Sequence, residues 1–221
     1  MEIFWIDTII SRGDSPDCKM VLISDAKEQY PRTVNLASGY WTTHPVDEYA
    51  LAPIDNYFHT LEINKVYECI TLLGKMGASK IHIKIEDKQE MENNSDLNVN
   101  YDEINGKINM KIMNSLSEYK DFDLQFPSIN KNNLDRSNKA DTELLEKSQW
   151  FKDDPEMDSI FKLWLSDNMP KTFRVTSKIN KTFGFDFKMA AQYLDVPILE
   201  VKNQYKKIKT ICRIIEVEFN N

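Results

Sequence analysis

Cysteine and glycine are scarce in this chain of 221 residues, and their scarcity excludes several kinds of site. The three cysteines, Cys18, Cys69 and Cys212, lie far apart and fit none of the paired spacings of zinc or redox sites, so we expect reduced structural thiols. With six glycines, the sequence contains no phosphate-binding loop, no dinucleotide fingerprint and no Gly-x-Ser-x-Gly nucleophile motif. We therefore predict no cofactor.

Long apolar runs are also missing. No window approaches the roughly 20 apolar residues that a transmembrane helix requires, so we predict no transmembrane span. The first ten residues contain two acids and no basic region, which is unlike a secretory signal, and we expect a cytoplasmic protein. The net charge of −7 opposes binding to a phosphate backbone, so nucleic acid is not the default partner.

The composition is that of a globular protein, with 41% hydrophobic and 29% charged residues. The clearest predicted element is a helix over residues 56–75, where apolar residues recur at helical spacing between an N-capping Asp55 and a C-terminal Gly77. A strand over residues 80–88 follows, because isoleucine alternates there with charged side chains. The short connection between them predicts that the helix packs against this strand.

The rest of the first 126 residues adds more strands and two irregular segments. Segments with strand-like apolar patterns are residues 1–10, 20–24, 104–113 and 121–126. Turn residues separate the first two of these strands, which suggests an opening hairpin. Residues 30–55 and 86–103 lack a sustained period, so we predict an ordered irregular segment and a solvated loop.

A polar, asparagine-rich stretch at residues 127–149 is the best candidate for a linker or insertion. Beyond it, the Asp154 cap and the apolar spacing predict a helix from residue 154 to about 169, followed by a strand over residues 172–187. Residues 198–210 fit a helix and a strand equally well, and β-branched residues favour a strand for the last ten residues.

These elements predict an α+β fold in which helices pack on a mainly antiparallel sheet. The sequence predicts a helix followed by strands in residues 1–126 and again in residues 150–221. The chain could therefore form two similar halves or one single domain. No repeat at the level of residues supports a duplication.

Histidines and carboxylates suggest two weak metal or catalytic sites. His59 and Glu62 lie three residues apart on the predicted helix and could share a metal ion with His44, although a hydrogen-bonded histidine at the edge of the core explains the same pattern. Alternatively, Asp55 with the Glu-x-Lys spacing of Glu86 and Lys88 matches the local pattern of restriction-type metal nucleases. An ordinary charged surface explains that pattern too.

The C-terminal region contains the residues that best suit partner binding. Lys206, Lys207 and Arg213 form a basic stretch in an acidic chain, and it could contact an acidic protein, lipid headgroups or a nucleic acid. Phe161 and Trp164 could form an aromatic ridge on the predicted helix, although aromatic residues at helical spacing belong more often to a core.

Since no complete catalytic arrangement is present, we predict a non-enzymatic interaction or regulatory protein whose partner is another protein. Two alternatives are a metal-dependent hydrolase or nuclease and a membrane-active, pore-forming effector, the latter suggested by alternating strands beside long polar segments. Frequent asparagine, lysine and isoleucine are typical of an AT-rich bacterial genome and fit a bacterial defence context. The oligomeric state is not predicted.

Overall fold

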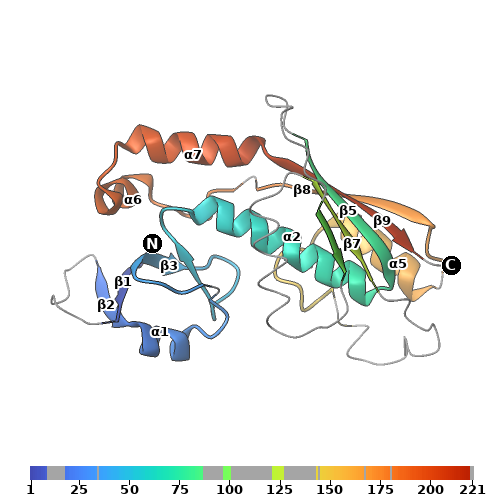
Figure 1. Ribbon diagram of the computed structural model, residues 1–221, viewed down its shortest axis with the longest axis horizontal. Coiled ribbons are helices and arrows are strands. Elements are labelled where there is room, and N and C mark those ends of the chain that lie inside the picture. The colour runs from blue at the N-terminus through green and yellow to red at the C-terminus, as the bar shows by residue number, and fades with distance from the viewer. Residues whose placement is uncertain are drawn as a thin grey trace. The chain divides into compact units, whose positions relative to one another are not determined.

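A computed structural model describes most of the chain. The described residues are 1–8, 18–33, 35–86, 97–100, 121–126, 143, 145–166, 168–179 and 181–219. They form five helices and nine strands, arranged in two sheets (Figure 1). The predicted α+β class is confirmed.

The chain divides into two compact units that are each discontinuous in sequence. Unit 1 contains residues 1–61 and 179–209, and unit 2 contains residues 62–178 and 210–221. Most of the predicted linker at residues 127–149 lies outside the described residues, so its role stays a prediction.

The sheet of unit 1 has four strands in the order β2-β1-β3-β4. Its strands are β1 (Ile3–Asp7), β2 (Lys19–Leu22), β3 (Gly39–Thr43) and β4 (Leu51–Pro53). β1 pairs with β2 in parallel and with β3 in antiparallel orientation. The predicted opening hairpin is therefore wrong, because two strands of a hairpin must be antiparallel. The segment predicted as irregular contains both β3 and β4.

Apolar side chains of β1, β3 and β4 pack with helix α1 (Ile23–Gln29) in unit 1. The buried members of this core are Phe4, Ile6, Ala26, Tyr30, Trp41 and Leu51. Trp41 is held in place by its indole nitrogen, which donates a hydrogen bond to the carbonyl of Ala37 at 2.9 Å.

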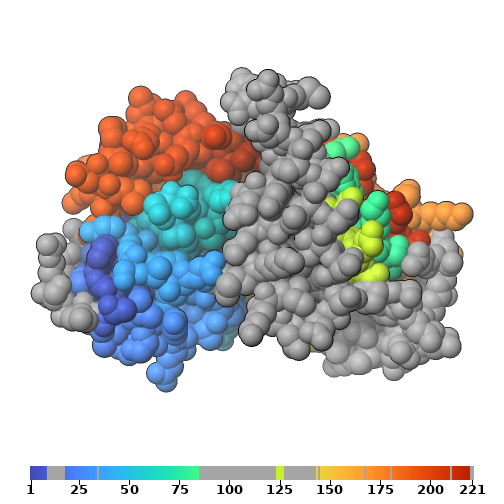
Figure 2. Space-filling model, in the orientation of Figure 1, coloured from blue at the N-terminus to red at the C-terminus, as the bar shows by residue number. Residues whose placement is uncertain are grey.

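Two further helices of unit 1 lie late in the chain, α6 (Phe187–Leu194) and α7 (Ile198–Thr210). Residues 198–210 are thus helical, and the strand predicted for residues 172–187 ends earlier, at Ser177. The segment that contains α6 and α7 forms part of the surface that faces the viewer in Figure 2.

An aromatic cluster joins α6 and α7 to the first turn of helix α2 (Tyr57–Lys75). Its members are Tyr57, Phe58, Phe185, Phe187 and Tyr205, whose ring centroids lie 4.5 to 6.0 Å apart in the recorded pairs. Burying such rings stabilises unit 1 beyond the area they remove from water.

The sheet of unit 2 has five strands in the order β6-β7-β5-β9-β8 and is antiparallel except for the β6–β7 pair. Its strands are β5 (Ala78–Glu86), β6 (Leu97–Asn100), β7 (Asp121–Gln125), β8 (Thr172–Ser177) and β9 (Cys212–Phe219). β6 lies within the predicted loop at 86–103, whereas the strand predicted at 104–113 lies outside the described residues. The predicted terminal strand is confirmed.

One face of this sheet packs against α2 and α5 (Pro155–Leu165). The predicted period of α2 is confirmed, because Val66, Ile70 and Leu73 share a core cluster with Ile81 and Ile83 of β5. Asp154 caps α5 as expected and accepts hydrogen bonds from two backbone amides of the first turn. This helix ends at Leu165, one turn earlier than predicted.

Candidate functional site

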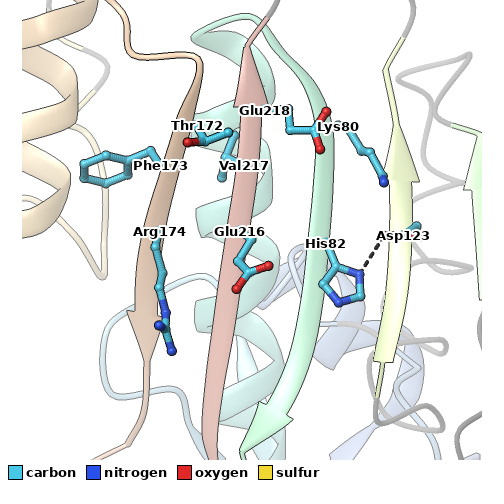
Figure 3. A pocket seen from close by; sticks show the side chains of 9 residues that line it. All are labelled: Lys80, His82, Asp123, Thr172, Phe173, Arg174, Glu216, Val217 and Glu218. Carbon is cyan, nitrogen blue, oxygen red and sulfur yellow. Dashed lines mark hydrogen bonds and ion pairs between the residues drawn. The ribbon is translucent and has the colours of Figure 1, made fainter.

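The polar face of the five-stranded sheet in unit 2 is the first candidate site. β-Strand alternation turns Ile81 and Ile83 toward the helices, so His82 between them points to the opposite face. The strand register then places Arg174, Glu216, His82 and Asp123 in one row across β8, β9, β5 and β7 (Figure 3). Polar side chains of four neighbouring strands thus lie side by side.

One hydrogen bond lies within this row, and a second one joins the row to Lys84 on the same face of β5. His82 Nδ1 lies 2.6 Å from Asp123 Oδ1, and Lys84 Nζ donates to Glu216 Oε1 at 3.0 Å. The hydrogen bond from Lys84 is the main reason why the pKa of Glu216 is below its usual value. Opposite charges on neighbouring strands stabilise a sheet by about 0.2–1 kcal/mol for each pair, so the contact between Lys84 and Glu216 has a structural explanation.

The row borders a pocket of about 760 Å³. Asp123 orients the imidazole of His82, which leaves the other ring nitrogen able to exchange a proton with a bound molecule. A nucleophilic mechanism also needs a hydroxyl or thiol held by that base. Thr172 supplies the pocket's hydroxyl, but it lies across from Glu218 in a different row. We therefore assign no reaction to this pocket.

Among the residues proposed as metal ligands, Glu62 has another role. Glu62 is buried in unit 2, where its two carboxylate oxygens accept hydrogen bonds from Arg213 Nε and Nη2. Its negative charge is thus neutralised by an arginine. His59 lies half-buried one turn earlier in α2. Within the part of the chain that the structure describes, no three potential metal ligands cluster together.

His44 lies in unit 1, in the loop between β3 and β4, with 5% of its surface exposed. Burial lowers its pKa from 6.5 to about 4, so the imidazole is neutral at pH 7. Its Nδ1 accepts a hydrogen bond from the amide of Val46 at 3.4 Å. These contacts give His44 a structural role in its loop.

The residues of the nuclease pattern fall in different places. Asp55 is an exposed residue of unit 1 just before α2, and Glu86 is the last residue of β5 in unit 2. Lys88 lies outside the described residues. The nuclease pattern therefore stays a prediction.

Three of the proposed partner-binding residues lie inside unit 2. Trp164 and Phe161 are 1% and 7% exposed, and their rings stack in the core with centroids 5.5 Å apart. Arg213 is 2% exposed because it pairs with Glu62. These side chains are not available at the surface of this unit, so a binding surface has to be built from the remaining pair, Lys206 and Lys207.

Lys206 and Lys207 are exposed on α7 in unit 1, together with Lys202 and Lys209. The opposite face of the helix carries Val201, which is 2% exposed, and the half-buried Tyr205 and Ile208. Tyr205 contacts the rings of Phe58 and Phe187, at 4.6 and 5.6 Å between centroids. The aromatic cluster thus fixes the direction in which the lysines point. We call Lys202, Lys206, Lys207 and Lys209 the lysine surface.

Comparisons with known proteins add no relative. No protein-family model, no curated protein and no solved structure matches this chain. Among the described residues, none of the helices is long and apolar enough to cross a membrane.

Proposed function

We propose that this protein is a cytoplasmic, non-enzymatic interaction or regulatory protein and that it binds an acidic partner through the lysine surface of α7. The observation that carries this proposal is the exposure of four lysines on one helix whose other face is fixed by the core of unit 1. The same helix contains a single acid, Glu200.

Electrostatics favours a partner for this surface. Lys202 and Lys206 lie four residues apart on the helix, where like charges destabilise the isolated helix by about 0.2–0.5 kcal/mol. An anionic partner removes that repulsion. A basic surface on a chain with net charge −7 also orients the protein toward the partner and raises the rate of encounter.

The two alternative functions, a metal-dependent hydrolase or nuclease and a pore-forming effector, have less support. The described carboxylates and histidines form no metal cluster of three or more ligands. The nuclease pattern includes Lys88, which lies outside the described residues, so it stays a prediction. The polar segments that suggested a pore-forming effector lie largely outside the described residues. The basic helix is the feature with a defined geometry.

The proposal is tested by reversing two charges. Lys206→Glu/Lys207→Glu is compared with Lys27→Glu/Lys152→Glu, which makes the same charge change at exposed positions elsewhere. Exposed substitutions change stability by about 0.5 kcal/mol or less, so both variants should keep the circular dichroism spectrum and melting temperature of the wild type.

The readout is capture of partners from a lysate of the organism of origin. We expect the wild type and the control variant to enrich the same molecules, and the Lys206→Glu/Lys207→Glu variant to lose them. If this variant captures them as well as the wild type at both low and high salt, the lysine surface is not the binding surface.

A further inference from the structure

Helices α6 and α7 form a helix-turn-helix. α6 is joined to α7 by the three residues 195–197, and the two helices run in clearly different directions (Figure 1). Asp186 caps α6 by accepting hydrogen bonds from the amides of Lys188 and Met189. A short turn between two crossing helices is the arrangement that lets the second helix enter the major groove of DNA.

The turn is specified by backbone geometry. Asp195 ends α6 in the left-handed region, with φ 55° and ψ 44°, a conformation that aspartate tolerates better than most residues. The amide of Val196 donates to the carbonyl of Ala191 at 3.1 Å, which closes the end of α6. Pro197 cannot continue α6, and its carbonyl accepts the amide of Glu200 at the start of α7.

Packing holds the two helices together. Ala190 and Ala191 of α6 and Val201 of α7 are 0%, 4% and 2% exposed. Burial of these three side chains shows that one face of each helix is turned toward the interior of unit 1. At the N-terminal end of α6, Phe187 contacts Tyr205 of α7 with ring centroids 5.6 Å apart, and this contact links the two helices.

The outer face of α7 presents side chains that suit base edges. Leu199, Lys202, Asn203 and Lys206 follow the spacing i, i+3, i+4 and i+7, which places them on one face of a helix. All four are exposed, and Leu199 is 64% exposed. An asparagine can bond both edge atoms of adenine, a lysine can bond guanine or phosphate, and an apolar side chain can contact the thymine methyl group.

The geometry points to duplex DNA as the partner of α7, with this outer face in the major groove and the other lysines on the phosphates. The inference rests on the proposed function, because it names the acidic partner of the same surface. A helix with side chains is about 10–12 Å wide, which matches the roughly 12 Å major groove of B-form DNA. The major groove of duplex RNA is too narrow and deep for such a helix.

The net charge of −7 opposes DNA binding on average, but the local charge of α7 favours it. Net charge describes the average field, whereas α7 carries four lysines and one glutamate. A DNA-binding helix needs a positive field only where it touches the phosphates. The prediction that nucleic acid is not the default partner was based on the charge averaged over the whole chain.

The test uses the full chain and a fluorescent, random-sequence DNA duplex about three helical turns long. Anisotropy is measured between about 50 mM and about 200 mM salt. We expect micromolar binding at low salt, a loss of at least tenfold in Lys206→Glu/Lys207→Glu, and no change in Lys27→Glu/Lys152→Glu. The slope of log affinity against log salt should become shallower in the first variant, by about 0.9 per lost phosphate contact.

Two further measurements separate groove reading from simple charge attraction. Duplex RNA of the same sequence should bind at least tenfold more weakly. A sequence selected from a randomised DNA library should be preferred by the wild type, and Asn203→Ala should reduce that preference about tenfold. Equal binding of RNA and DNA, or selection that yields no preferred sequence, would overturn the inference.

The outcomes distinguish the inference from the proposed function. If DNA does not bind, or binds equally well after the double reversal, the inference fails. If the double reversal then still abolishes capture of an acidic protein, the proposed function stands with a protein partner. If neither DNA binding nor protein capture depends on Lys206 and Lys207, both proposals fail.

Discussion

The buried ion pair between Glu62 of α2 and Arg213 of β9 gives the sharpest prediction of stability. The side chains are 1% and 2% exposed, so both charges have lost nearly all contact with water. Two guanidinium nitrogens donate to the two carboxylate oxygens. Such a pair offsets its desolvation only while both partners are present.

Removing one partner should therefore be much worse than removing both. Glu62→Leu leaves the guanidinium buried without its carboxylate, and we expect a loss of about 3–5 kcal/mol in the free energy of unfolding of unit 2. Arg213→Met should cost a similar amount for the opposite reason. In Glu62→Leu/Arg213→Met, both positions become apolar beside the core cluster, and the stability should be equal to the wild type or up to about 4 kcal/mol higher.

Hydrogen exchange of the β5 and β9 amides during a urea titration measures this prediction, because both strands belong to unit 2. A double variant that recovers to the wild-type midpoint gives a coupling energy of several kcal/mol. Single variants that each lose less than about 1 kcal/mol would show that water or another charge supports the remaining partner, and the reasoning would be refuted.

Three shorter predictions address other contacts. The pKa of His44 is lowered to about 4 in the folded protein, so the unfolded chain binds the proton first as the pH falls below 6.5. Between pH 7 and pH 5, the wild type should therefore lose about 2 kcal/mol more stability than His44→Gln. Equal dependence of stability on pH in the two proteins would contradict this prediction. In Gly74→Ala, the new Cβ would lie 2.7 Å from the Phe126 ring. The cost of overpacking, about 1–3 kcal/mol, should exceed the gain in helix propensity, about 1 kcal/mol, so the variant should melt below the wild type. Gly74→Ala/Phe126→Leu should melt at a higher temperature than Gly74→Ala, and a Gly74→Ala variant that melts above the wild type would contradict the prediction. Lys84→Met should raise the pKa of Glu216 in an NMR titration, and an unchanged pKa would show that another group lowers it.

Elements with strong local signals were predictable from the sequence. The apolar period of α2, the alternation of β5 and the Asp154-Pro155 start of α5 each depend on neighbouring residues, and all three are confirmed. α6 was missed because the aromatic residues Phe183, Phe185 and Phe187 alternate as in a strand. The signal that identifies the helix is Asp186, whose side chain caps it.

Contacts between distant residues were not predictable from local patterns. Arg213 meets Glu62, which is 151 positions away, and His82 meets Asp123, which is 41 positions away. The parallel pairing of β1 with β2 is likewise a contact that no local pattern in the sequence specifies. The positive charge of Lys206 and Lys207 predicted that both side chains are exposed, because an exposed lysine keeps its hydration.

Helices α6 and α7 lie in a long connection between two neighbouring strands of unit 2. β8 and β9 are antiparallel neighbours, and Ser177 pairs with Arg213. Residues 178–211 therefore leave the sheet of unit 2, and the chain returns to the sheet beside the point where it left. A turn of about two to five residues would join these strands. The longer excursion adds little to the entropy of loop closure, about 0.6 kcal/mol for each doubling of length. The pairing of β8 with β9 therefore does not require α6 and α7, and the fold of unit 1 gives no reason for four exposed lysines on one of them. The aromatic contacts of Phe187 and Tyr205 explain why the segment packs in unit 1, and the proposed binding role accounts for the charge on its outer face.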